Sequence, residues 1–153
     1  MKIAEVLGEE LIIEEMKAAN KQDALREFSE LLGASGLVDD KEGLTRILAA
    51  RESLGSTGIG DGVAIPHGKL KGLKNLIMAF GRSKKGVAFD SLDGGPAHLF
   101  FLLVAPEDAP GEHLKALARV SRLMKSRDLR ESLLKAPDKK EIRRILVQEE
   151  ERR

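Results

Sequence analysis

The sequence contains no cysteine, tryptophan or tyrosine. Without cysteine there can be no disulfide bond, thiolate nucleophile or cysteine metal site, and this composition fits a reducing compartment. Aromatic residues make up only 3% of the chain and all of them are phenylalanine, so a platform for stacking nucleic-acid bases is not expected.

The chain also lacks an excess of one charge and a long apolar run. Its 26 basic residues face 25 acidic residues, whereas binding to nucleic acid or to an anionic membrane needs a positive excess. The longest apolar run, residues 99–105, is far shorter than the roughly 20 residues that cross a bilayer. The acidic start lacks the layout of a signal peptide. We therefore expect a cytoplasmic protein with no nucleic-acid partner and no stable membrane insertion.

The composition is that of one folded domain. Of the 153 residues 42% are apolar and 33% are charged, which favours a folded chain over a disordered one. No linker or repeat divides the sequence. We predict a single domain over residues 1–153, whose last ten or so residues form a loose charged tail.

Helical patterns flank a central region with two apolar strands. Asn20 precedes the first helical pattern, and Asp39 or Asp40 precedes the second. Residues 75–82 and 99–105 are expected to be strands, and the second should be central because it is apolar throughout. The helix expected from residue 112 onward has an apolar stripe of Leu114, Leu117, Val120 and Met124. The order predicts an α/β fold with a mixed β-sheet flanked by helices on both faces.

The segment most informative about chemistry is residues 51–69, RESLGSTGIGDGVAIPHGK. Its central glycines are spaced GxGxG, so it is neither a P-loop nor a dinucleotide-binding fingerprint. His67 follows a proline, which limits the freedom of the backbone, and precedes Gly68, which should leave room beside the imidazole. A rigidly presented, uncrowded imidazole suits a phosphoryl or acyl acceptor. The alternative is an ordinary loop histidine.

This segment resembles the active-site signature of the type-2 enzyme IIA domains of the bacterial phosphoenolpyruvate-dependent phosphotransferase system (PTS). These are the fructose/mannitol-type and nitrogen-regulatory IIA proteins. The resemblance continues through FFLLVAPEDAPGEHLKALARVSRLM and reaches about residue 137. The residues that carry the signature are Glu52, Ile59, Gly60, Val63, Ala64, Ile65, Pro66, His67 and Gly68.

The resemblance implies a phosphotransferase with a phosphohistidine at His67. An HPr-like phosphocarrier protein would phosphorylate His67, which would pass the group to a cysteine of an enzyme IIB in sugar uptake. The alternative is a nitrogen-regulatory protein that binds regulatory targets and whose phosphorylation state is a signal. No cofactor is implied, and a metal site built on His67 and His113 lacks an evident third ligand.

The resemblance also implies two supporting residues, Arg51 and His113. Arg51 would bind the phosphoryl group through its guanidinium, although a basic residue is also favoured at a helix C-terminus. His113 would contact the phosphoryl group from the first turn of a helix, the alternative being a surface histidine. The role of Glu52 stays open between anchoring the loop and taking part in the chemistry. His98 matches no catalytic position and is interpreted as structural.

Partner proteins are expected to dock on an apolar rim around His67. Ile59, Val63 and Ile65 are candidates by position, but the same residues could be buried in the sheet.

Overall fold

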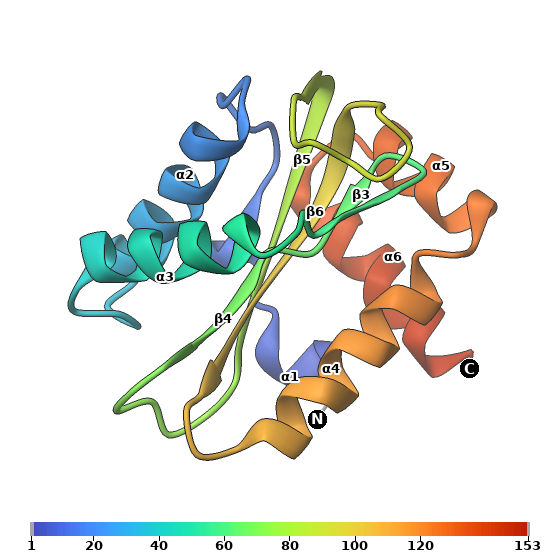
Figure 1. Cartoon of the computed structure of the whole chain (residues 1–153). Coiled ribbons are helices and arrows are strands. Elements are labelled where there is room, and N and C mark those ends of the chain that lie inside the picture. Colours follow the sequence, from blue (N-terminus) through green and yellow to red (C-terminus); the bar gives the residue numbers. More distant parts are fainter. Residues whose placement is uncertain (1, 153) are drawn as a thin grey trace.

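The computed structural model describes residues 2–152, which form a mixed six-stranded sheet between two layers of helices (Figure 1). The helices are α1 (Ile3–Val6), α2 (Lys21–Ala34), α3 (Lys41–Ser53), α4 (Pro110–Leu123), α5 (Arg127–Lys135) and α6 (Lys139–Glu151), with a 3-10 turn at Glu9–Leu11. The strands are β1 (Ile12–Ile13), β2 (Gly58–Gly60), β3 (Val63–Ala64), β4 (His67–Leu70), β5 (Ile77–Val87) and β6 (Ala97–Pro106). The predicted α/β fold in a single domain is confirmed.

Strand β6 is the centre of the sheet, as its apolar sequence predicts. It pairs antiparallel with β5 on one side and parallel with both β3 and β4 on the other. Every residue of β6 except His98 is buried. Helices α2 and α3 cover one face of the sheet, and α4, α5 and α6 cover the other (Figure 1).

The first two long helices begin at the predicted caps. The Asn20 side chain accepts a hydrogen bond from the backbone N–H of Asp23 at 2.9 Å. Asp40, rather than Asp39, caps α3 by accepting from the N–H of Gly43, also at 2.9 Å. Each cap satisfies a backbone donor that the first turn of the helix would otherwise leave unpaired.

The predicted apolar stripe of α4 is partly wrong. The buried positions are His113, Ala116, Val120 and Leu123, whereas the side chain of Leu114 is 68% exposed. The prediction counted only apolar residues as buried, and one of the buried residues of this helix is a histidine. The predicted inner face therefore began at Leu114, one residue after the true one.

The structure adds a strand where the sequence indicated a loop. His67 is the first residue of β4, which runs parallel to the last part of β6. The role expected for Gly68 is also corrected, since a Cβ atom at this residue would lie 2.8 Å from Cγ2 of Ile47 in α3. Successive residues of a strand face opposite sides of the sheet. Gly68 therefore allows α3 to approach the sheet and does not make room beside the imidazole.

The loose C-terminal tail expected from the sequence is instead helical within the described residues. Helix α6 continues to Glu151, and the carboxylate of Glu150 accepts a hydrogen bond from the backbone N–H of Ile3 at 2.7 Å. The same carboxylate pairs with Arg119 of α4 at 3.1 Å. These contacts tie the last turn of the chain to its first helix and to α4.

Within residues 2–152, the helices are too short or too polar for any of them to traverse a bilayer.

Gly81→Ala is expected to destabilise the fold by about 1–3 kcal/mol, the usual cost of overpacking a core. Gly81 lies in β5, where a Cβ atom would be 2.7 Å from Sδ of Met16 and 2.8 Å from Cζ of the fully buried Phe28. Thermal unfolding should show a melting temperature several degrees lower. Gly111→Ala is the matched control, because a Cβ atom there meets nothing within 4 Å. Equal melting temperatures for the two variants would contradict the packing argument.

Candidate active site

The imidazole of His67 is held by the backbone just before it. Its Nδ1 atom lies 2.8 Å from the carbonyl oxygen of Ile65. A carbonyl can only accept a hydrogen bond, so Nδ1 carries the proton in this arrangement and the lone pair is left on Nε2. The ring is half-buried. The structure thus presents Nε2 as the nucleophilic atom.

His113 lies against His67 and is not a surface residue. Its side chain comes from the first turn of α4, and the residue is only 6% exposed. The two ring centroids are 5.1 Å apart and the rings meet edge to face at 82°. The Nε2 atom of His113 is buried without a hydrogen-bond partner. A buried polar atom without a partner costs free energy, so this atom is available to a group that arrives at the site.

The pKa values of both imidazoles are lowered, which favours their neutral forms. Burial lowers the pKa of His67 and is the largest cause of its shift. The hydrogen bond to the Ile65 carbonyl raises this pKa by less, and the charges of Arg51 and Glu52 then lower and raise it, respectively. Burial also lowers the pKa of His113, and the neighbouring His67 and Lys69 add to this effect. Neutral imidazole is the nucleophilic form.

Lys69 is a site residue that the sequence reasoning missed. It acts on the pKa of His113 and lies two residues after His67 in β4. Residues two apart in a strand share a face of the sheet. Once β4 is recognised as a strand, this spacing is the signal that places Lys69 on the side of the two histidines.

Arg51 lies at the end of a helix and close to His67. At the C-terminal end of α3, its Nη1 atom donates a hydrogen bond to the carbonyl oxygen of Gly55 at 2.9 Å. This contact holds the turn that follows the helix, and the last turn of α3 is where the helix macrodipole favours a positive charge. The same guanidinium is close enough to lower the pKa of His67. A guanidinium has several N–H donors in one plane, so a bond to Gly55 leaves others for an anion.

Glu52 anchors the start of the glycine-rich segment. Its Oε1 atom accepts a hydrogen bond from the backbone N–H of Thr57 at 3.0 Å and pairs with Nζ of Lys21 at 3.0 Å. Its Oε2 atom accepts from the hydroxyl of Thr57. The loop-anchoring role that the sequence left open is therefore present.

The remaining sequence candidates lie apart from the histidine pair or in the sheet. His98 lies near the start of β6, and its Nδ1 atom is 2.8 Å from the carbonyl oxygen of Ser83. His67, by contrast, pairs with Leu103 near the end of that strand. Of the three apolar candidates for the docking rim, Val63 and Ile65 are buried, whereas Ile59 is 42% exposed.

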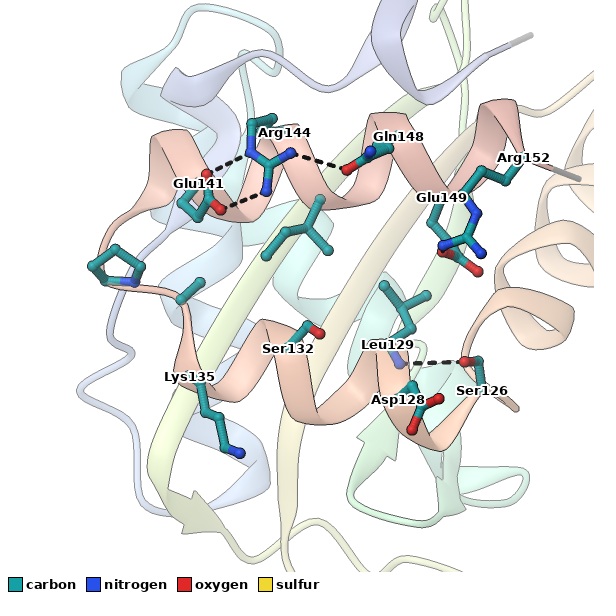
Figure 2. Close-up of a pocket in the computed structure, with 13 residues that line it drawn as sticks. Ser126, Asp128, Leu129, Ser132, Lys135, Glu141, Arg144, Gln148, Glu149 and Arg152 are labelled. Atoms are coloured by element: carbon teal, nitrogen blue, oxygen red, sulfur yellow. Dashed lines mark hydrogen bonds and ion pairs between the residues drawn. The ribbon is translucent and has the colours of Figure 1, made fainter.

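A separate cleft of about 640 Å³ lies between α5 and α6 and contains none of the residues described above (Figure 2). Its charges largely satisfy one another. Arg144 donates to both carboxylate oxygens of Glu141 and to Gln148, and Arg152 pairs with Glu149. Over residues 2–152, no three histidine, aspartate or glutamate side chains come together in a way that could hold a metal ion.

Comparison with known proteins places the chain close to one family. The family model described as "Phosphoenolpyruvate-dependent sugar phosphotransferase system, EIIA 2" matches residues 5–149. A nitrogen regulatory protein of Bradyrhizobium diazoefficiens is 39% identical over 96% of this chain and 95% of its own length. The fructose-specific EIIABC component of the PTS in Bacillus subtilis is 40% identical over 97% of this chain, which spans only 23% of that relative.

The solved structures agree with this result. The crystal structure of the nitrogen regulatory protein IIA-Ntr from Neisseria meningitidis superposes with a TM-score of 0.86 and is 40% identical in sequence. The match covers 94% of this chain and 98% of the other.

Proposed function

Because the chain belongs to the EIIA type 2 family of the phosphoenolpyruvate-dependent sugar phosphotransferase system, we propose that it is a phosphocarrier that accepts and donates a phosphoryl group at His67. Members of this family are phosphotransfer components. The observation that carries the proposal is the edge-to-face pair of His67 and His113, in which Nδ1 of His67 is hydrogen-bonded to a backbone carbonyl.

The transfer step follows from this arrangement. Nε2 of His67 attacks the phosphorus of a phosphohistidine on an HPr-like donor. A new N–P bond forms while the N–P bond of the donor breaks, and the donor ring takes back the electron pair. The His67 ring keeps its proton on Nδ1, so the positive charge that it gains is next to the carbonyl of Ile65. In the onward step a cysteine thiolate of an enzyme IIB attacks the same phosphorus, and His67 returns to its neutral form.

Charges around the pair would stabilise the group in transit. Phosphoryl transfer asks mainly for positioning and for stabilisation of charge on the phosphoryl oxygens. Arg51 and Lys69 are the basic groups that act on the histidine pair. We assign Arg51 and His113 to direct contact with the phosphoryl group, in keeping with their roles in the family.

Two exposed leucines give the docking surface its apolar contacts. Leu54, which follows Arg51 at the end of α3, is 83% exposed, and Leu114, next to His113, is 68% exposed. Apolar contacts at the core of an interface favour association of protein surfaces. We propose that the HPr-like donor and the acceptor dock over these leucines in turn.

The second candidate function is regulation, with the phosphorylation state of His67 as the signal. It is favoured by the similarity to nitrogen regulatory proteins over nearly their whole length. One experiment separates the two. The protein is phosphorylated with phosphoenolpyruvate, enzyme I and an HPr-like carrier, and then mixed with an enzyme IIB domain. Movement of the phosphoryl group to the IIB cysteine supports the carrier, whereas a stable phosphoprotein that transfers to no IIB supports the regulator. A chain that takes up no phosphate contradicts both.

The pKa of His113 is expected to rise when His67 is phosphorylated. The phosphoryl group brings close to two negative charges beside a ring whose pKa is lowered in the free protein. Protonated His113 should then stabilise phosphorylated His67 at low pH, and this stabilisation should fade as the pH rises through the raised pKa. NMR titration of the ring in both forms measures the effect.

The ring signals of His98 serve as the internal reference, because this ring is hydrogen-bonded to Ser83 near the other end of β6. The His113→Gln variant should flatten the pH dependence of transfer. Identical titration curves for His113 in the two forms would show that it does not contact the phosphoryl group.

A further inference from the structure

We propose that Glu52 is a positioning residue that fixes the proton of His67 on Nδ1 and so keeps Nε2 free for the phosphoryl group. This inference rests on the phosphocarrier function proposed above. It extends that function to a residue whose carboxylate bonds to Thr57 and Lys21 and not to the ring itself.

The first step of the connection is the bonding of the carboxylate. The side chain of Glu52 is only 4% exposed, and each of its oxygens is engaged by Thr57 or Lys21. An ionised carboxylate only accepts hydrogen bonds, so both the N–H and the hydroxyl of Thr57 must donate to it. These two hydrogen bonds to the same residue set the orientation of the Thr57 backbone.

The second step leads from Thr57 to the imidazole. The carbonyl of Thr57 accepts a hydrogen bond from the N–H of Ile65 at 3.0 Å. The carbonyl of Ile65 in turn accepts from Nδ1 of His67 at 2.8 Å. On the other side, the carbonyl of Pro66 is held by the N–H of Leu103 at 3.1 Å. The Ile65 carbonyl is therefore fixed from both directions and aimed at the ring.

A second carboxylate in the same region shows what loop anchoring alone requires. Asp93 is exposed, and it holds the turn at the far end of the glycine-rich segment by accepting from the N–H groups of Asp61 at 3.1 Å and Gly95 at 3.0 Å. A buried carboxylate is costlier than an exposed one because it must give up its hydration. The burial of Glu52 is explained if its negative charge also acts on the imidazole of His67. That charge raises the pKa of His67, whereas the charge of Arg51 lowers it.

The test uses Glu52→Gln, Thr57→Val and the matched control Asp93→Asn. Nitrogen-15 NMR of the imidazole in the unphosphorylated protein reports which ring nitrogen carries the proton. We expect one tautomer, with the proton on Nδ1, in the unchanged chain and in Asp93→Asn. Glu52→Gln and Thr57→Val should populate the other tautomer. Because Thr57→Val removes a single hydroxyl and keeps the shape of the side chain, it tests the connection even if Glu52→Gln folds poorly.

Single-turnover transfer from the phosphorylated HPr-like carrier supplies the second readout. We expect a rate about tenfold lower in Glu52→Gln at an unchanged half-saturating carrier concentration, since a displaced nucleophile slows the chemical step. The double variant Glu52→Gln/Thr57→Val should be no slower than Glu52→Gln alone, because both changes break the same chain of hydrogen bonds. A wild-type tautomer in Glu52→Gln, or a rate equal to that of Asp93→Asn, would overturn the proposal. Failure of the unchanged chain to accept phosphate would instead remove the phosphocarrier function and leave the NMR result to decide the role of Glu52.

Discussion

A chain with His67 replaced by alanine is expected to gain no phosphate from phosphoenolpyruvate, enzyme I and an HPr-like carrier. The unchanged chain should gain a single acid-labile phosphoryl group, measured as intact mass. The reason is that Nε2 of His67 carries a lone pair at a half-buried position beside Arg51 and His113. Nε2 of His113 is itself buried, and His98 lies near the other end of β6. The chain has no cysteine that could accept the group instead.

His98→Gln is the matched control for this loss. His98 is one of the three histidines of the chain, and it bonds to Ser83 near the other end of β6. This variant should take up one phosphoryl group as the unchanged chain does. Phosphate retained on the His67→Ala protein would show that the phosphorylated residue is another one.

Arg51→Lys is expected to slow phosphoryl transfer by about a hundredfold while leaving the fold intact. Lysine keeps the positive charge but lacks the planar fork that can bind Gly55 and a phosphoryl oxygen together. Loss of one such contact in the transition state costs about 2–3 kcal/mol, which corresponds to the expected fall in rate. Rapid-quench measurement of transfer from the phosphorylated carrier gives the rate, and the melting temperature reports on the fold.

Arg46→Lys makes the same chemical change on the same helix at an exposed position. It should transfer at the rate of the unchanged chain. If Arg51→Lys also transfers at that rate, Arg51 serves only to hold the turn that follows α3.

Local sequence signals determined the fold class and the centre of the site. The apolar run of β6 predicted a central strand covered on both faces. Asn20 predicted the start of one helix, and Asp39 or Asp40 the start of the next, where the structure selects Asp40. The signature around His67 indicated the family, which the family model then matched over residues 5–149. These features could be predicted because each is written in a short stretch of chain.

The surroundings of His67 were decided by the tertiary structure. His113 is far from His67 in the sequence, and only the packing of α4 on the sheet buries it and brings the rings to 5.1 Å. The loop-anchoring role of Glu52 depends on its contacts with Thr57 and Lys21, which only the folded chain brings to its carboxylate. Burial and the partners of a buried charge depend on residues that the chain brings together from separate elements. The physical reason is that desolvation and hydrogen bonding are properties of a folded neighbourhood, whereas a sequence pattern records only the order of residues.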